Sequence, residues 1–74
     1  MDVRQLMIDA LLSKYKAQVD DATAKIVVYL HNPVGIGEHP DVLAAIQTQL
    51  DVIAHEEERI HVLLKFFNDP VHAE

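Results

Sequence analysis

Two series of apolar residues, spaced alternately three and four positions apart, occupy most of the chain. The first series is Ile8, Leu12, Tyr15, Val19, Ala22, Ile26 and Tyr29. The second series, with one polar member, is Leu43, Ile46, Leu50, Ile53, Glu57, Ile60, Leu64 and Phe67. A mean spacing of about 3.5 residues is typical of helices that pack along their length. The pattern predicts an all-α fold, an antiparallel two-helix hairpin with helices over about 2–31 and 40–68.

The segment between the two series, "NPVGIGEHP", holds both glycines and two of the three prolines. Asn32 precedes a proline, which disfavours helical angles, whereas Gly35 and Gly37 can take positive φ. Pro40 suits the first turn of a helix. These residues predict a structured loop that reverses the chain. A phosphate-binding loop is the alternative interpretation, but the third glycine of a dinucleotide motif and the lysine of a P-loop are both missing.

The first helix has a predicted start and one rival interpretation near its end. Asp2 is expected to cap its first turn. Residues 25–30, "KIVVYL", are rich in β-branched and aromatic side chains and would also suit a β-strand before the glycine loop. The apolar series continues through Ile26 and Tyr29, and a single strand would have no sheet to join. The helix is therefore the preferred interpretation.

One polar contact is predicted inside the hairpin. The register that pairs Val19 with Ile53 also brings Tyr15 opposite Glu57. A phenol hydroxyl can donate to a carboxylate that would otherwise be costly to bury. We expect this pair to fix the register, as single polar residues do in coiled coils. A proton-accepting role for Glu57 is the alternative, although no nucleophile or second base accompanies it.

A chain of 74 residues forms one domain, 1–74, with residues 70–74 as a frayed tail. The core of so small a domain supplies only about 3–5 kcal/mol, and the absence of cysteine excludes disulfides. Several apolar residues lie on neither predicted packing face: Leu6, Met7, Val27, Val28, Val52, Val62 and Phe66. Two helices cannot enclose them, so we expect a homodimer that forms a four-helix bundle.

The charge balance and the apolar runs restrict the partners. Twelve acidic residues oppose six Lys and Arg, for a formal net charge of -6, which disfavours nucleic acid. The apolar runs are shorter than a membrane span requires. No basic region or cleavage site marks the N-terminus as a signal peptide. The expected location is the cytoplasm, without membrane or nucleic-acid partners.

A metal site is the main chemical alternative. Glu58 and His61 have the Glu-x-x-His spacing of di-iron carboxylate bundles, and Asp9 would lie nearby across the hairpin. A dimer would double this set into a ferritin-like centre, with Glu57 as a further ligand. The first helix contains no glutamate to complete such a site. We therefore predict no metal and no cofactor, and a charged surface in which Asp9 pairs with His61.

Two smaller sets of residues have little chemical support. His31 and His39 lie on either side of the loop, but two histidines without a third ligand make a weak metal site. Ser13 is the only serine, and no base is expected opposite it. The sequence predicts no enzymatic activity.

The stretch "NPVGIGEHPD", followed by an amphipathic helix that ends in "LLKFFND", resembles small uncharacterised helical proteins of T4-type phages, including those of marine cyanobacteria. The resemblance covers about 26–68 and implies a phage-encoded protein in the host cytoplasm, with no activity to transfer. Together with the apolar surface, it favours a non-enzymatic protein that self-associates and binds another protein.

Overall fold

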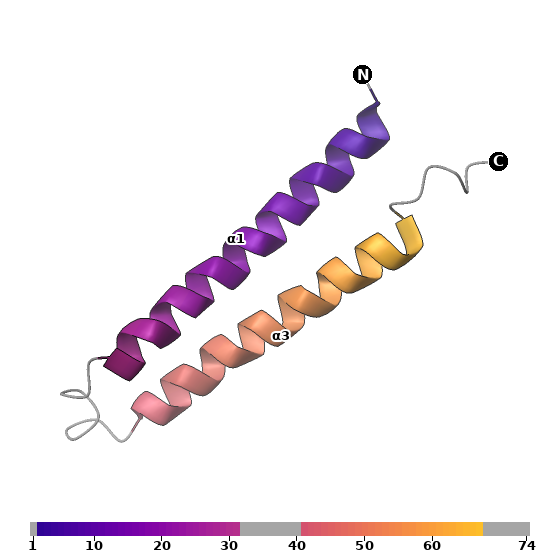
Figure 1. Cartoon of the computed structure of the whole chain (residues 1–74). Coiled ribbons are helices and arrows are strands. Elements are labelled where there is room, and N and C mark those ends of the chain that lie inside the picture. Colours follow the sequence, from indigo (N-terminus) through magenta and orange to yellow (C-terminus); the bar gives the residue numbers. More distant parts are fainter. Residues whose placement is uncertain (1, 32–40, 68–74) are drawn as a thin grey trace.

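The computed structural model describes residues 2–31 and 41–67. Helices α1 (Val3–His31) and α3 (Val42–Phe67) lie side by side and run in opposite directions (Figure 1). The predicted all-α hairpin is confirmed. Residues 25–30 belong to α1, so the alternative β-strand is wrong. The predicted glycine turn and the predicted frayed tail fall outside the described residues.

Both ends of α1 are held by specific contacts. The Asp2 carboxylate accepts a hydrogen bond from the backbone amide of Arg4 at 3.0 Å, as expected for an N-cap. The Arg4 guanidinium donates to the backbone carbonyl of Phe67, where α3 ends. At the other end of α1, His31 Nδ1 lies 3.0 Å from the carbonyl oxygen of Val27. Arg4 thus stabilises the C-terminus of α3 and ties the two helices together at one end of the hairpin.

The face of α1 that contacts α3 is the one that the sequence predicts. Every residue of the first apolar series is buried or half-buried, whereas its sequence neighbours are exposed. Ala22 is 0% exposed and Ile8 is 5% exposed. The alternating spacing of three and four residues therefore identified the packing face of α1 completely.

The prediction for α3 was correct at alternate positions only. Ile46, Ile53 and Ile60 are half-buried, as expected. The other predicted positions are exposed: Leu43, Leu50, Glu57, Leu64 and Phe67. Four residues, each one position earlier than an exposed leucine or Glu57, are half-buried or buried instead: Val42, Gln49, Glu56 and Leu63. Helix α3 is thus rotated about its axis relative to the prediction.

The rotation of α3 has an electrostatic reason. The predicted orientation of α3 would bring Glu57 between the helices, whereas the observed orientation brings Glu56 there. Glu56 has a cation, Arg59, three residues later, and the two side chains form an ion pair. The residue three positions after Glu57 is Ile60, which cannot compensate a buried carboxylate. The observed orientation buries the acid that has its own counter-ion.

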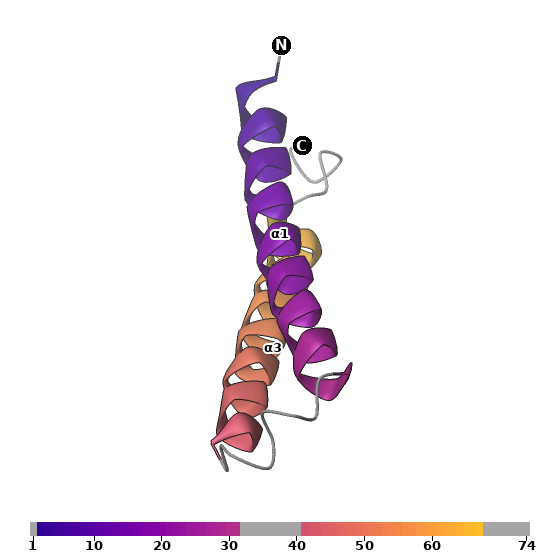
Figure 2. The same ribbon diagram turned by 90° about the vertical axis from the view of Figure 1, so that its left-hand side faces the viewer.

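The hairpin encloses little apolar volume. It is a rod of 58 × 19 × 13 Å, and Figure 2 shows α1 crossing in front of α3. Within the described residues, Ile8 and Ala22 are the buried apolar side chains. The accessible surface is 5682 Å², against about 4,600 Å² for a compact monomer of 8.3 kDa. The fold therefore leaves most of its apolar side chains in contact with solvent. Neither α1 nor α3 has a segment of the length and apolarity needed to cross a membrane.

Candidate functional site

Three side chains form a polar cluster near the middle of the hairpin. Glu56 is 6% exposed, and Arg59 Nη1 donates to its Oε2 at 3.2 Å and to its Oε1 at 3.4 Å. The Arg59 guanidinium carbon also lies 5.7 Å from the centre of the Tyr15 ring on α1. At this distance a cation is attracted by the face of an aromatic ring. Arg59 therefore neutralises the buried acid of its own helix and holds the facing helix by a cation–π contact.

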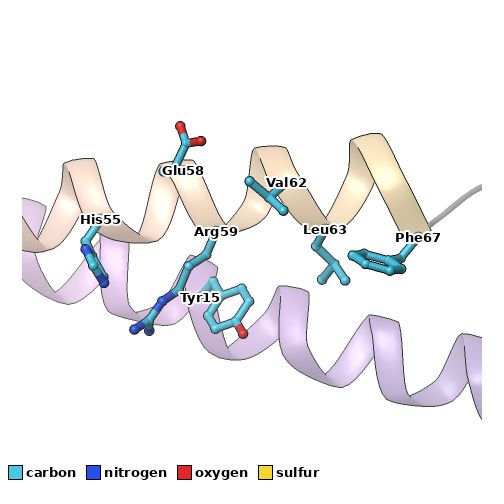
Figure 3. Close-up of a pocket in the computed structure, with 7 residues that line it drawn as sticks. All are labelled: Tyr15, His55, Glu58, Arg59, Val62, Leu63 and Phe67. Carbon is cyan, nitrogen blue, oxygen red and sulfur yellow. The ribbon is translucent and has the colours of Figure 1, made fainter.

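A shallow recess of about 360 Å³ lies beside this cluster (Figure 3). The Arg59 and Tyr15 side chains lie next to each other on one side of it, and Leu63 and Phe67 bound the other side. Glu58 also lines the recess, but its carboxylate points away from the side chains of Tyr15 and Arg59. The walls are mainly apolar, and the guanidinium is already engaged by Glu56. The recess can therefore accept an apolar side chain, but it presents no nucleophile with an adjacent base.

The expected pair of Tyr15 with Glu57 does not form. Tyr15 is half-buried, as predicted, but Glu57 is exposed. The buried acid is Glu56, and its hydrogen bonds come from Arg59 rather than from the phenol hydroxyl. The rotation of α3 accounts for this correction. The signal that could have identified the cluster is the spacing of Glu56 and Arg59, because residues three apart on a helix are neighbours.

The residues of the metal alternative are not brought together. Within residues 2–31 and 41–67, no three His, Asp or Glu side chains are placed to hold a metal ion. Asp9 accepts a hydrogen bond from Gln5 at 2.9 Å instead of forming the expected ion pair with His61. Glu58 and His61 are both exposed. The set Asp9, Glu58 and His61 therefore does not form a site within one hairpin.

The remaining chemical candidates give no site in the described residues. His31 contacts the backbone of its own helix, and His39 lies outside the described part. Ser13 is exposed on α1.

The residues expected to contact a second copy are mostly exposed. Five of the seven are exposed: Leu6, Met7, Val27, Val28 and Phe66. The other two, Val52 and Val62, are half-buried. The contact with a second copy stays a prediction. Leu11, Leu30 and the exposed leucines of α3 were not predicted to contact a second copy. The α3 leucines belong to the apolar series that was expected to face α1.

No protein-family model, curated protein or solved structure matches this chain.

Proposed function

We propose that this protein is a non-enzymatic helical hairpin that assembles with copies of itself and binds another protein. The observation that carries the proposal is the exposed apolar surface. Twelve large apolar side chains of the described residues are exposed: Val3, Leu6, Met7, Leu11, Val27, Val28, Leu30, Leu43, Leu50, Leu64, Phe66 and Phe67. Monomeric proteins rarely expose large apolar patches, so this number of exposed apolar side chains favours a partner.

The size of this surface suits a dimer. The total accessible area, polar and apolar together, exceeds that of a compact monomer of equal mass by roughly 1,000 Å². A stable protein–protein contact buries about 800 Å² on each partner. One further copy can therefore cover the excess, and burial of apolar surface contributes about 25 cal/mol per Å² to its binding.

Helix α3 supports binding of a different protein. Leu43, Leu50 and Leu64 recur at multiples of seven residues, so they lie along one side of the helix, and all three are exposed. The exposed Glu57 stands on the same side, between Leu50 and Leu64. Asp51 and Glu58 are exposed beside this apolar stripe. A stripe of this kind suits an amphipathic helix with basic flanks, the usual partner in helix-in-groove recognition.

Sedimentation velocity tests the self-association. We expect a species of twice the 8.3 kDa monomer mass at concentrations of roughly 1–100 μM, the range in which contacts of moderate affinity form. The sedimentation coefficient should fall on dilution as the dimer dissociates. A monomer mass over the whole range would contradict the proposal.

A further inference from the structure

The side of α1 that faces away from α3 carries large apolar side chains near both ends and small ones between them, together with the charged residues Lys14, Asp20 and Asp21. Leu6 and Met7 are exposed near its start, and Val27 and Val28 are exposed near its end. Between these pairs, at intervals of seven residues, lie the exposed Ala10, Ala17 and Ala24. Residues seven apart share one side of a helix, so the alanines form a strip. Leu6 and Val28, each eleven residues from Ala17, continue the strip at its two ends, and Met7 and Val27 lie at its edges. We name this surface the α1 outer face.

We propose that a second copy of this chain covers the α1 outer face, with the two α1 helices antiparallel and a two-fold axis at Ala17. The inference rests on the proposed self-association and assigns its surface. Under this symmetry Ala17 meets Ala17, and Ala10 meets Ala24 of the second copy. Met7 and Leu6 then reach Val28 and Val27, respectively, so that large apolar side chains pack together at both ends.

The charges of the α1 outer face complement each other in this arrangement. Lys14 comes within one residue of the level of Asp21 of the second copy, and the symmetry repeats the contact. Both side chains are exposed. Within its own hairpin Asp21 pairs with Lys25 at 3.0 Å, a contact that leaves both side chains more than half exposed. A parallel arrangement would instead place the Asp20 and Asp21 carboxylates of both copies at one level, where they repel.

A recess at the edge of the α1 outer face agrees with this register. It has a volume of about 300 Å³, and its walls are Asp21, Ala24, Lys25, Val28 and Tyr29. The symmetry brings Met7 of the second copy to Val28, beside this recess. An unbranched methionine can fill such an irregular apolar gap.

Paired substitutions test which surface is covered. Leu6 on the α1 outer face is 53% exposed, and Leu50 on α3 is 51% exposed, so the two leucines are matched in exposure. We expect Leu6→Glu to raise the dimer dissociation constant about tenfold or more and Leu50→Glu to leave it nearly unchanged, in sedimentation equilibrium. Circular dichroism checks that both variants keep their helix content.

The outcomes separate this inference from the proposed function. A monomeric wild type overturns both. A dimeric wild type that loses affinity equally in the two variants, mainly in Leu50→Glu, or in neither, leaves self-association in place and overturns the assignment to the α1 outer face.

Cysteine cross-linking tests the symmetry, since the natural sequence contains no cysteine. We expect Ala17→Cys to give a disulfide-linked dimer on mild oxidation, because a two-fold axis at this residue brings the two sulfurs within bonding range. The matched control is Ala54→Cys, at an exposed alanine of α3, which should not cross-link. A mixture of Ala10→Cys and Ala24→Cys should form the mixed dimer. Equal cross-linking of Ala17→Cys and Ala54→Cys, or none by Ala17→Cys, overturns the antiparallel register.

Discussion

The buried carboxylate of Glu56 depends on a cation from its own helix. Arg59 is half-exposed, and its guanidinium bonds both oxygens of Glu56 while lying over the Tyr15 ring. Removing one member of a buried pair leaves the other unsatisfied, whereas replacing the acid by an apolar group removes the need for the pair. The two members should therefore respond differently to substitution.

We expect Arg59→Met to lower the free energy of unfolding by about 1–3 kcal/mol, because methionine keeps the packing stem but leaves the carboxylate unsatisfied. Glu56→Leu should leave the free energy of unfolding unchanged or raise it. Urea denaturation at one fixed protein concentration measures both. A larger loss for Glu56→Leu than for Arg59→Met would contradict this account.

The two helices differ in how far their sequences determine their packing. In α1 the apolar series has polar or small residues on each side near its middle, so only one face can be buried, and the prediction was correct. In α3 leucines flank the isoleucines on one side, and Val42 and Leu63 flank them on the other. Hydrophobic spacing alone cannot choose between these orientations. The observed orientation of α3 is the one that allows Arg59 to contact both Glu56 and Tyr15. The contact of Arg59 with Tyr15 joins residues far apart in the sequence.

The hydrogen bond that caps α1 gives a prediction for the stability of this helix. Asp2→Ala should lower the free energy of unfolding by about 1 kcal/mol, because the amide of Arg4 loses its acceptor. Asp2→Asn keeps a side-chain oxygen that caps a helix and is the matched control. Thermal melts followed by circular dichroism compare the two. If both variants lost the same stability, the effect would come from the negative charge of Asp2 rather than from its capping hydrogen bond.

The close contact of the helices at Ala22 gives a second prediction. Ala22 has no exposed surface, so Ala22→Leu must displace α3 and should lower the free energy of unfolding by about 1–3 kcal/mol. Ala54→Leu makes the same change at an exposed alanine of α3 and should have little effect. Chemical denaturation measures the free energy of unfolding of both variants. An unchanged free energy of unfolding in Ala22→Leu would mean that the helices do not pack closely at Ala22.

At the scale of the whole molecule, the described residues of the hairpin bury two apolar side chains and leave twelve large apolar side chains exposed. The sequence predicted this deficit from the short chain, the lack of cysteine and the apolar residues outside both packing faces. It could not show which of these residues share one side, because that requires the orientation of both helices. Val52 and Val62, which were expected on the exposed surface, are half-buried for this reason.

If dimerisation contributes to stability, the melting temperature should rise with protein concentration by mass action. We expect a measurable rise over a roughly hundredfold range of concentration and a smaller one for Leu6→Glu. Melts recorded by circular dichroism provide the measurement. A wild-type melting temperature that does not change over this range would show that the hairpin folds without a second copy.

The bond from Arg4 to the Phe67 carbonyl brings the first and last described turns to the same pole of a rod 58 Å long. A fluorescent donor and acceptor attached near these two positions would therefore report strong energy transfer while the helices stay together. Separation of the helices at that pole would abolish the signal before any helix had melted, so hinge-like opening and loss of helical structure could be followed independently.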